Sequence, residues 1–200
     1  MQRAPIDLIP LDDVPPQRWF NGGGWTREIA RGGGAQDWDW RLSVADVEAD
    51  GPFSRLPGIE REIYLLEGAG MQFDFADGEA FALTPESPRL RFDGGRALDS
   101  RLIDGPTRDF NLMWRRDRAV ADLWRRPLVG SMVLFAEAGE TWAIHMLAGE
   151  ARLADGDGQG IVRGDTVLLH AGDARQRCAL EGAGEALLVR IAPILDAGAQ

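Results

Sequence analysis

Short apolar runs separated by turn-forming residues constrain the fold of this chain more than any other feature. Apolar and polar residues partly alternate within each run, and clusters of Gly, Pro and Asp separate neighbouring runs. The runs cover residues 25–30, 38–47, 62–66, 71–75, 81–83, 90–92, 110–114, 131–135, 141–147, 166–169 and 185–192. Strands at this spacing are typical of β-sandwiches and barrels, so we expect a mainly β protein. Only residues 117–125 suggest a helix, a short one that ends before Pro127.

The net charge and the missing residue types narrow the class of function. The 200 residues carry a formal charge of −10, which disfavours binding to nucleic acid or to an anionic membrane. All 22 cationic residues are arginine, so lysine Schiff-base chemistry and a P-loop lysine are excluded. The single cysteine, Cys178, excludes a disulfide within the chain. The N-terminal residues lack a signal-peptide core and no apolar run has membrane-spanning length, so we expect a soluble cytoplasmic protein.

A short internal repeat predicts two β units. Residues 63–68 resemble residues 144–149, and both segments are short strands that end at a glycine. A repeated β unit of this kind indicates a duplicated architecture. We therefore expect an N-terminal unit over residues 1–120 and a C-terminal unit over residues 121–200, with N-terminal strands that can pair across the units.

Two segments resemble the paired motifs of the cupin family. Residues 62–68, which read Glu-Ile-Tyr-Leu-Leu-Glu-Gly, resemble the first motif. Residues 163–172 resemble the second motif, a Gly-Asp pair followed by a strand and a turn, with His170 in the position of the usual proline. The resemblance implies a bicupin, in which one chain forms two jelly-roll-like β-barrel units.

Five segments resemble, in the right order, the signature of the HutD/Ves family. They are residues 19–30, 39–43, 50–54, 57–61 and 109–113. The resemblance implies a cytoplasmic bicupin that is encoded with histidine-utilisation genes and that binds a pathway metabolite or restrains the pathway. No established catalytic activity comes with it.

The metal ligands that the cupin resemblance implies are missing. Cupin enzymes usually bind a metal with a His-x-His pair, a glutamate and a third histidine. The His-x-His positions fall near residues 55–58 and the third histidine falls near Arg89, and none of these residues is histidine. The chain has only two histidines, His145 and His170. We therefore expect no metal and no other cofactor.

A glycine-rich segment is the first candidate binding site. Its candidate ligand-binding residues are Asn21, Gly22, Gly23, Gly24, Thr26 and Arg27. Consecutive glycines permit positive φ angles, and their N–H groups can then converge on an anion. We expect Gly23→Ala to weaken binding more than Gly33→Ala, which lies in a plain hairpin turn. The alternative is an ordinary glycine-rich loop whose Arg27 pairs with a surface carboxylate.

Residues on later strands complete the predicted site: Arg41, Ser43, Arg61 and Asn111. Arg41 and Ser43 share one face of a strand because side chains alternate, although Arg41 in a solvated cross-strand ion pair is an equal alternative. Arg61 suits bidentate pairing with a carboxylate at the mouth of a metal-free cupin. Glu28 and Glu62 are candidates for orienting these groups or for acid–base chemistry.

Three functions stay open. The one we favour is a metal-free bicupin that binds a small anionic metabolite of histidine degradation, urocanate or N-formylglutamate, in a regulatory role. The second is an enzyme that acts on such a metabolite with Glu28 or Glu62 as its base. The third is a protein that contacts a pathway enzyme or repressor through residues 115–126. Exposed strand edges also allow a homodimer.

Overall fold

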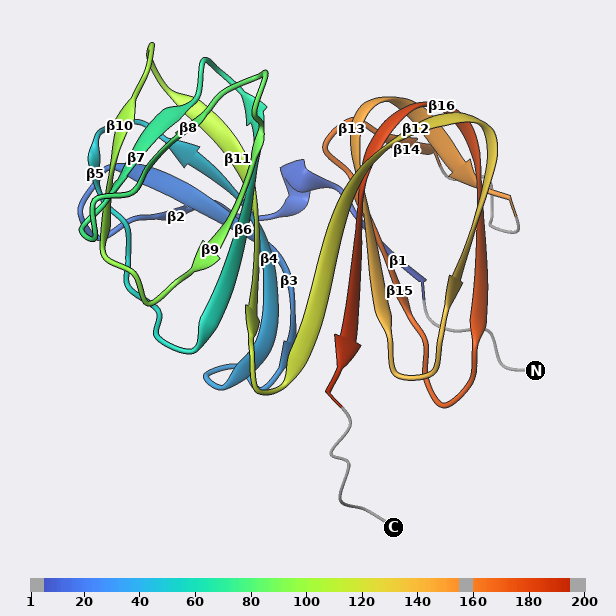
Figure 1. Ribbon diagram of the computed structural model, residues 1–200. Helices are drawn as coiled ribbons and strands as arrows, with labels where there is room; N and C mark the ends of the chain where they lie inside the picture. Colours follow the sequence, from blue (N-terminus) through green and yellow to red (C-terminus); the bar gives the residue numbers. More distant parts are fainter. Residues whose placement is uncertain (1–5, 155–159, 195–200) are drawn as a thin grey trace. The chain divides into compact units, whose positions relative to one another are not determined.

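The chain folds as a mainly β protein, as the run spacing predicts. The computed structural model describes residues 6–154 and 160–194 (Figure 1). Among these residues the only helical element is a 3-10 turn, η1 (Leu11–Asp13). The chain divides into two compact units: the N-terminal unit, Pro15–Arg118, and the C-terminal unit, Ala119–Gln200 with Met1–Val14. No helix in the described part of the chain is long and apolar enough to span a membrane.

Two antiparallel sheets build the N-terminal unit. The larger sheet has the order β2 (Gln17–Arg18), β3 (Gly24–Gly33), β4 (Trp38–Val47), β11 (Thr107–Arg115), β6 (Ile59–Glu67) and β9 (Arg89–Asp93). The smaller sheet has the order β5 (Gly51–Pro52), β10 (Leu98–Leu102), β7 (Met71–Phe75) and β8 (Ala80–Leu83).

Apolar side chains from both sheets form the core of the N-terminal unit. On β7, Met71, Phe73 and Phe75 are buried while the residues between them are partly exposed, so a period of two directs one face inward. They pack in one cluster with Ile63 on β6 and Phe92 on β9. Strand β11 lies at the centre of the larger sheet and is buried on both faces from residue 109 to 114. Polar residues on this strand therefore sit in the interior.

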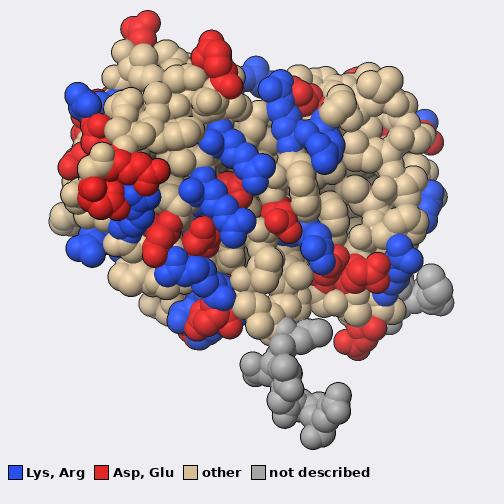
Figure 2. Space-filling model, viewed as in Figure 1, with Lys and Arg blue, Asp and Glu red and all other residues tan. Residues whose placement is uncertain are grey.

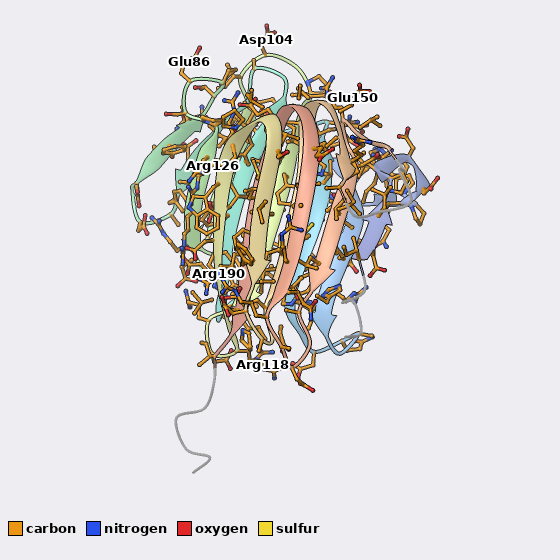
Figure 3. All side chains as sticks on the ribbon, turned by 90° about the vertical axis from the view of Figure 1, so that its right-hand side faces the viewer. Glu86, Asp104, Arg118, Arg126, Glu150 and Arg190 are labelled. Carbon is orange, nitrogen blue, oxygen red and sulfur yellow. The ribbon has the colours of Figure 1, made fainter. Side chains whose placement is uncertain are left out.

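One sheet of long strands builds the C-terminal unit. Its order is β1 (Ile6–Ile9), β15 (Thr166–His170), β13 (Thr141–Leu153), β16 (Gln176–Pro193) and β12 (Ala119–Ala136), with β14 (Gly160–Val162) on β13. Figure 3 shows β12, β16 and β13 side by side. Strand β1 joins this unit because it pairs with β15, from Ile6 opposite Leu169 to Ile9 opposite Thr166. An apolar cluster that includes Ile144, Met146 and Leu188 fills its interior.

The short helix predicted for residues 117–125 is wrong. Residues from Ala119 onward belong to β12, which pairs with β16 along its whole length. Ala119, Ala121 and Leu123 are buried and alternate with more exposed residues, which is the period of a strand. Two of the more exposed positions are apolar, Val120 and Trp124, so the period is hidden in the sequence, and the tertiary pairing with β16 determines the conformation.

Candidate functional site

A cavity of about 620 Å³ lies in the N-terminal unit, against the sheet that contains β4, β6 and β11. Six of the sequence-predicted residues line it: Asn21, Thr26, Arg41, Ser43, Arg61 and Asn111. Apolar side chains form much of the remaining wall, among them Trp19, Phe20, Trp38, Phe53 and Met113. A concave, largely apolar space with a few convergent polar groups is the usual form of a small-molecule site.

Strand register brings the polar side chains of this cavity together. On β11, Asn111 and Met113 share one face because side chains alternate. Ser43 on β4 lies opposite Asn111, and Arg41 lies opposite Met113. Arg61 on β6 lies opposite Met113 from the other side. Three neighbouring strands therefore present their polar residues to the same space.

Arg61 is the most deeply buried cation of the cavity, at 6% exposure. Its guanidinium lies 5.0 Å from the ring centroid of Phe53 and 5.4 Å from that of Phe92. Its Nη2 donates to Oδ1 of Asn111 at 3.0 Å, whereas its Nε has no hydrogen-bond partner among the described residues. Burial lowers the Arg61 pKa to about 10, against the opposing effect of the Asp109 carboxylate. Arg61 therefore stays cationic at neutral pH and keeps an unused donor.

Asp109 is a cavity residue that the sequence analysis missed. The Asn111 side-chain amide donates to its Oδ1, while Oδ2 has no partner within the described structure. Asp109 is 1% exposed, and burial raises its pKa to about 7, although Arg61 and the Asn111 hydrogen bond lower it. The available signal was its place two residues before Asn111, which puts both on one face of a strand.

Arg41 forms the second cationic group of the cavity. Its guanidinium lies 5.4 Å from the Trp38 ring centroid, and its Nη2 is 3.4 Å from the Met113 sulfur. Its Nε is buried without a partner in the described part of the chain. Burial lowers the pKa of Arg41, and the Glu28 carboxylate, 4.0 Å away, raises it. The Ser43 hydroxyl belongs to the same wall.

Asn21 and Thr26 line the cavity from the glycine-rich segment. The Thr26 hydroxyl accepts a hydrogen bond from the Trp19 indole at 2.7 Å, which fixes the tryptophan in the wall. The Asn21 carboxamide oxygen accepts one from the Gly23 N–H at 3.0 Å. Part of the hydrogen-bonding capacity of Asn21 and Thr26 is therefore used within the loop.

The predicted backbone anion site at the glycines is wrong in its geometry. The positive φ lies at Gly22, at 73°, and not at Gly23. The Gly22 N–H donates to the Trp19 carbonyl at 2.9 Å, and the Gly23 N–H is also bonded within the loop. A Cβ on Gly24 would lie 2.3 Å from the Asp46 carbonyl oxygen. These glycines permit a tight turn and close strand packing, and they do not line the cavity.

Comparison with known proteins identifies the family. The HutD family model matches residues 11–188. The chain belongs to the HutD family. It is 39% identical over 125 residues to an uncharacterized 21.2 kDa protein in the hutC 3' region of Pseudomonas putida, a match that covers 59% of this chain and 63% of that protein. It is 37% identical over 118 residues to protein Ves of Citrobacter koseri, covering 58% and 61%. These matches span less than two thirds of the curated relatives' length.

Solved structures share the fold over nearly the whole chain. HutD from Pseudomonas fluorescens SBW25 has a TM-score of 0.82 at 30% identity, covering 96% of this chain and 100% of that one. A conserved protein of unknown function from Pseudomonas aeruginosa PAO1, PA5104, has a TM-score of 0.79 at 27% identity with the same coverage. The pirin YhhW of Escherichia coli, solved with nickel(II), has a TM-score of 0.68 at 10% identity, again covering 96% and 100%. This last likeness shows the cupin-like fold alone.

Arg27 of this HutD-family chain lies outside the cavity, although its neighbour Thr26 lies in it. Successive residues of β3 point to opposite faces of the sheet. On the far face, Arg27 pairs with Asp46 at 2.6 Å, and Arg108 binds the other oxygen of the same carboxylate at 2.6 Å. Arg27 therefore forms an ion pair with a carboxylate, which was its alternative interpretation. It is not part of the ligand site.

The two predicted glutamates are also absent from the cavity wall. Glu28 pairs with Arg31 at 2.6 Å and lies 4.0 Å from Arg41, so its carboxylate is engaged with arginines. Glu62 is fully buried on the opposite face of β6 from Arg61, where it pairs with Arg89. Glu62 therefore does not orient the cavity arginines.

Metal-ligating side chains do not gather in the described part of the chain. No group of three or more His, Cys, Asp or Glu residues there is arranged to hold a metal ion. Both histidines belong to the C-terminal unit, where one nitrogen of His145 lies 2.9 Å from the Thr166 hydroxyl and one of His170 lies 3.0 Å from the Thr141 hydroxyl. Burial lowers the His145 pKa to about 4, so this side chain is neutral at physiological pH.

Proposed function

We propose that this HutD-family chain is a cytoplasmic bicupin that binds a small anionic metabolite in the cavity of its N-terminal unit and thereby helps to regulate histidine degradation. The names of its relatives support the pathway, because one lies in a hutC 3' region and another is HutD. The observation that carries the binding role is the pair of buried, unpartnered Nε donors on Arg41 and Arg61 in one cavity.

Desolvated arginine donors are costly unless something pairs with them. An unsatisfied buried polar group costs about 1–3 kcal/mol, and more when it is charged. A carboxylate pairs well with guanidinium groups, by short and charge-assisted hydrogen bonds. The Asn21 amide and the Ser43 hydroxyl line the same space and add neutral hydrogen-bonding groups. A carboxylate therefore binds more favourably in this cavity than at the solvated surface of the protein.

The walls of the cavity favour urocanate over N-formylglutamate. Three aromatic side chains, Trp19, Trp38 and Phe53, line the cavity. A planar, rigid ligand buries its faces on such rings and loses little conformational freedom on binding. N-formylglutamate has a flexible chain and a second carboxylate that must also be desolvated. We therefore expect urocanate to bind more tightly.

A ligand screen tests this function. Thermal-shift and calorimetric titrations with urocanate and N-formylglutamate should show saturable stabilisation by urocanate and a weaker effect of N-formylglutamate. Chromatography of the recovered ligand should show no chemical change. A protein whose melting temperature neither compound moves would lack the proposed site.

The second candidate function is that of an enzyme, and one observation supplies a different candidate for its general base. The glutamates expected to act as bases lie outside the cavity wall, but Asp109 is a buried carboxylate within it, with a pKa raised to about 7 by burial. General bases work best when their pKa lies near the working pH. Turnover of urocanate or N-formylglutamate that Asp109→Asn abolishes would favour this alternative.

A protein partner for residues 115–126 has less support. Arg115 pairs with Asp37 at 2.8 Å, Arg116 with Asp93 at 2.9 Å, and Arg125 with Glu185 at 2.6 Å. Figure 2 shows arginines and carboxylates intermixed over the face in view. These charges are already balanced locally, so the segment does not form a free basic patch for an acidic partner.

A further inference from the structure

Asp109 is an unusual group to find in an anion-binding cavity. It is a carboxylate, it is 1% exposed, and it shares the cavity wall with Arg61 and Asn111. A fixed negative charge in this place repels the anion that the arginines attract. The proposed function therefore leaves Asp109 unexplained, and its surroundings indicate what it does.

A relay of hydrogen bonds joins Asp109 to the cationic wall. Arg61 makes no ion pair with Asp109; instead its Nη2 donates to Oδ1 of Asn111, whose amide nitrogen donates to Oδ1 of Asp109. The amide of Asn111 thus separates the two charges by one side chain. An anion that takes up the free donors of Arg61 weakens the attraction that keeps Asp109 ionised.

The charged groups around Asp109 come from both neighbouring strands. Arg61 projects from β6, and β4 contributes Arg41 on the cavity face and Asp46 on the other. Of these, Arg61 favours the ionised carboxylate, while Asp46 disfavours it. On β11 itself, Arg108 points to the far face and pairs with Asp46. Arg61 is therefore the main cation that stabilises a negative Asp109.

We propose that an anion enters this cavity together with one proton, which is taken from solvent and bound by Oδ2 of Asp109. The geometry suits a protonated Asp109. Its Oδ1 continues to accept the hydrogen bond from the Asn111 amide, while the new O–H forms on Oδ2, which has no partner within the described structure. The proton cancels the charge of Asp109 and leaves both arginines to the ligand. The inference rests on the proposed function, since it needs an anion in the cavity.

Supporting this coupling, burial already raises the pKa of Asp109 to about 7 before any ligand binds. A ligand anion near Arg61 raises this pKa further. The bound state then holds more protons than the free state at and above neutral pH. By linkage, affinity must fall as the pH rises through this range.

Calorimetry with trans-cinnamate tests the coupling. Cinnamate is planar and anionic, and it has no group that titrates near neutral pH, whereas the imidazole of urocanate does. Titrations at pH 7.5 in phosphate and in Tris, whose ionisation enthalpies differ, should show uptake of about half to three quarters of a proton per bound cinnamate. Between pH 6 and pH 9 the affinity should fall about ten-fold.

Two variants assign the proton. Asp109→Asn should bind cinnamate without proton uptake and with the same affinity at pH 6 and pH 9. Asp99→Asn, the same charge change at an exposed residue of the same unit, should keep both the uptake and the pH dependence. If Asp109→Asn does not fold, the proton count of the unaltered protein decides the matter.

The outcomes separate this inference from the proposed function. Binding that Arg61→Met abolishes, but that takes up no proton and does not vary with pH, would overturn the coupling and leave the anion site intact. Failure of cinnamate, urocanate and N-formylglutamate to bind at any pH from 6 to 9 would overturn both.

Discussion

In the N-terminal unit two buried polar groups, Arg61 and Asp109, are incompletely paired, whereas in the C-terminal unit the buried Glu140 is paired with Arg190 and the buried histidine is neutral and has a partner. Arg61 and Asp109 line a cavity and each has an unpartnered polar atom. His145 lies on β13, where Thr166 contacts it and apolar residues such as Ile144 and Met146 pack around it. Both units use antiparallel β-sheet, so sheet architecture does not set this difference.

This difference indicates that the two units have different roles. A buried charge without a full set of partners is tolerated where a ligand can complete it, and strain of this kind concentrates at functional sites. A neutral, hydrogen-bonded group costs little and adds specificity to packing. The N-terminal unit therefore has the features of the binding unit, and the C-terminal unit has those of a stable support.

The largest expected effect is the response of stability to pH through Asp109. Its pKa in the folded chain is about 7, above the ordinary value of 3.8. Through this group the folded state binds more protons than the unfolded state between these values, and the contribution of Asp109 to stability falls by roughly 4 kcal/mol as the pH rises from 4 to 7. Urea unfolding at pH 7.5 should show Asp109→Asn to be more stable than the unaltered protein, with no gain at pH 4. Equal stability of the two at pH 7.5 would show that the buried carboxylate costs nothing.

His145 should give the opposite response. Burial lowers its pKa to about 4, below the ordinary value of 6.5, so the unfolded state binds the extra proton. The contribution of His145 to the free energy of unfolding should fall by roughly 3 kcal/mol as the pH falls from 6.5 to 4, while the contribution of Asp109 rises over the same range. Urea unfolding across that range should show that His145→Gln gains stability relative to the unaltered protein as the pH falls. A difference between the two proteins that does not change with pH would show that His145 contributes no acid sensitivity.

Arg61→Met should separate binding from folding. Methionine keeps much of the side-chain bulk and removes the charge, so the affinity for urocanate should fall by about 1.5–3 kcal/mol, or ten- to a hundred-fold. Stability without ligand should change little, because the loss of the unpaired donor is offset by the loss of the Asn111 hydrogen bond and of the attraction to Asp109. Arg101→Met is the matched control, since Arg101 lies on β10 and pairs with Asp74 at the surface. Unfolding of Arg61→Met would instead mark Arg61 as a structural residue.

The smallest expected effect contrasts two glycines of the N-terminal unit. Gly33 has a φ of 88°, and a Cβ there would lie 2.8 Å from the Asp39 amide nitrogen. Gly33→Ala should therefore cost about 1 kcal/mol or more in thermal unfolding. Gly23 has no positive φ, and its nearest contact to an added Cβ, at 3.4 Å, is the Asn21 side chain. Gly23→Ala should leave stability nearly unchanged. A loss of ligand affinity that is larger for Gly23→Ala than for Gly33→Ala would restore the backbone anion site.

The sequence by itself determined the class of the fold and most of the polar residues of the cavity wall, but not its apolar part or Asp109. Apolar alternation predicted strands, and in Met71, Phe73 and Phe75 the same period directs one face to the core. Alternation also placed Arg41 and Ser43 on one face, and both line the cavity. These inferences succeed because the geometry of a strand is local. Side chains alternate along it, so residues two positions apart face the same side.

Only the tertiary structure decided which charges are paired and which are free. Arg27 and Arg61 look alike in sequence, yet Arg27 meets Asp46 and Arg108 on the far face while Arg61 is buried with an unused donor. Asp109 became a site residue because central strand β11 carries it into the interior and burial raises its pKa. The physical reason is that ion pairing and desolvation depend on partners distant in the chain. Strand register chooses those partners, and no single segment encodes them.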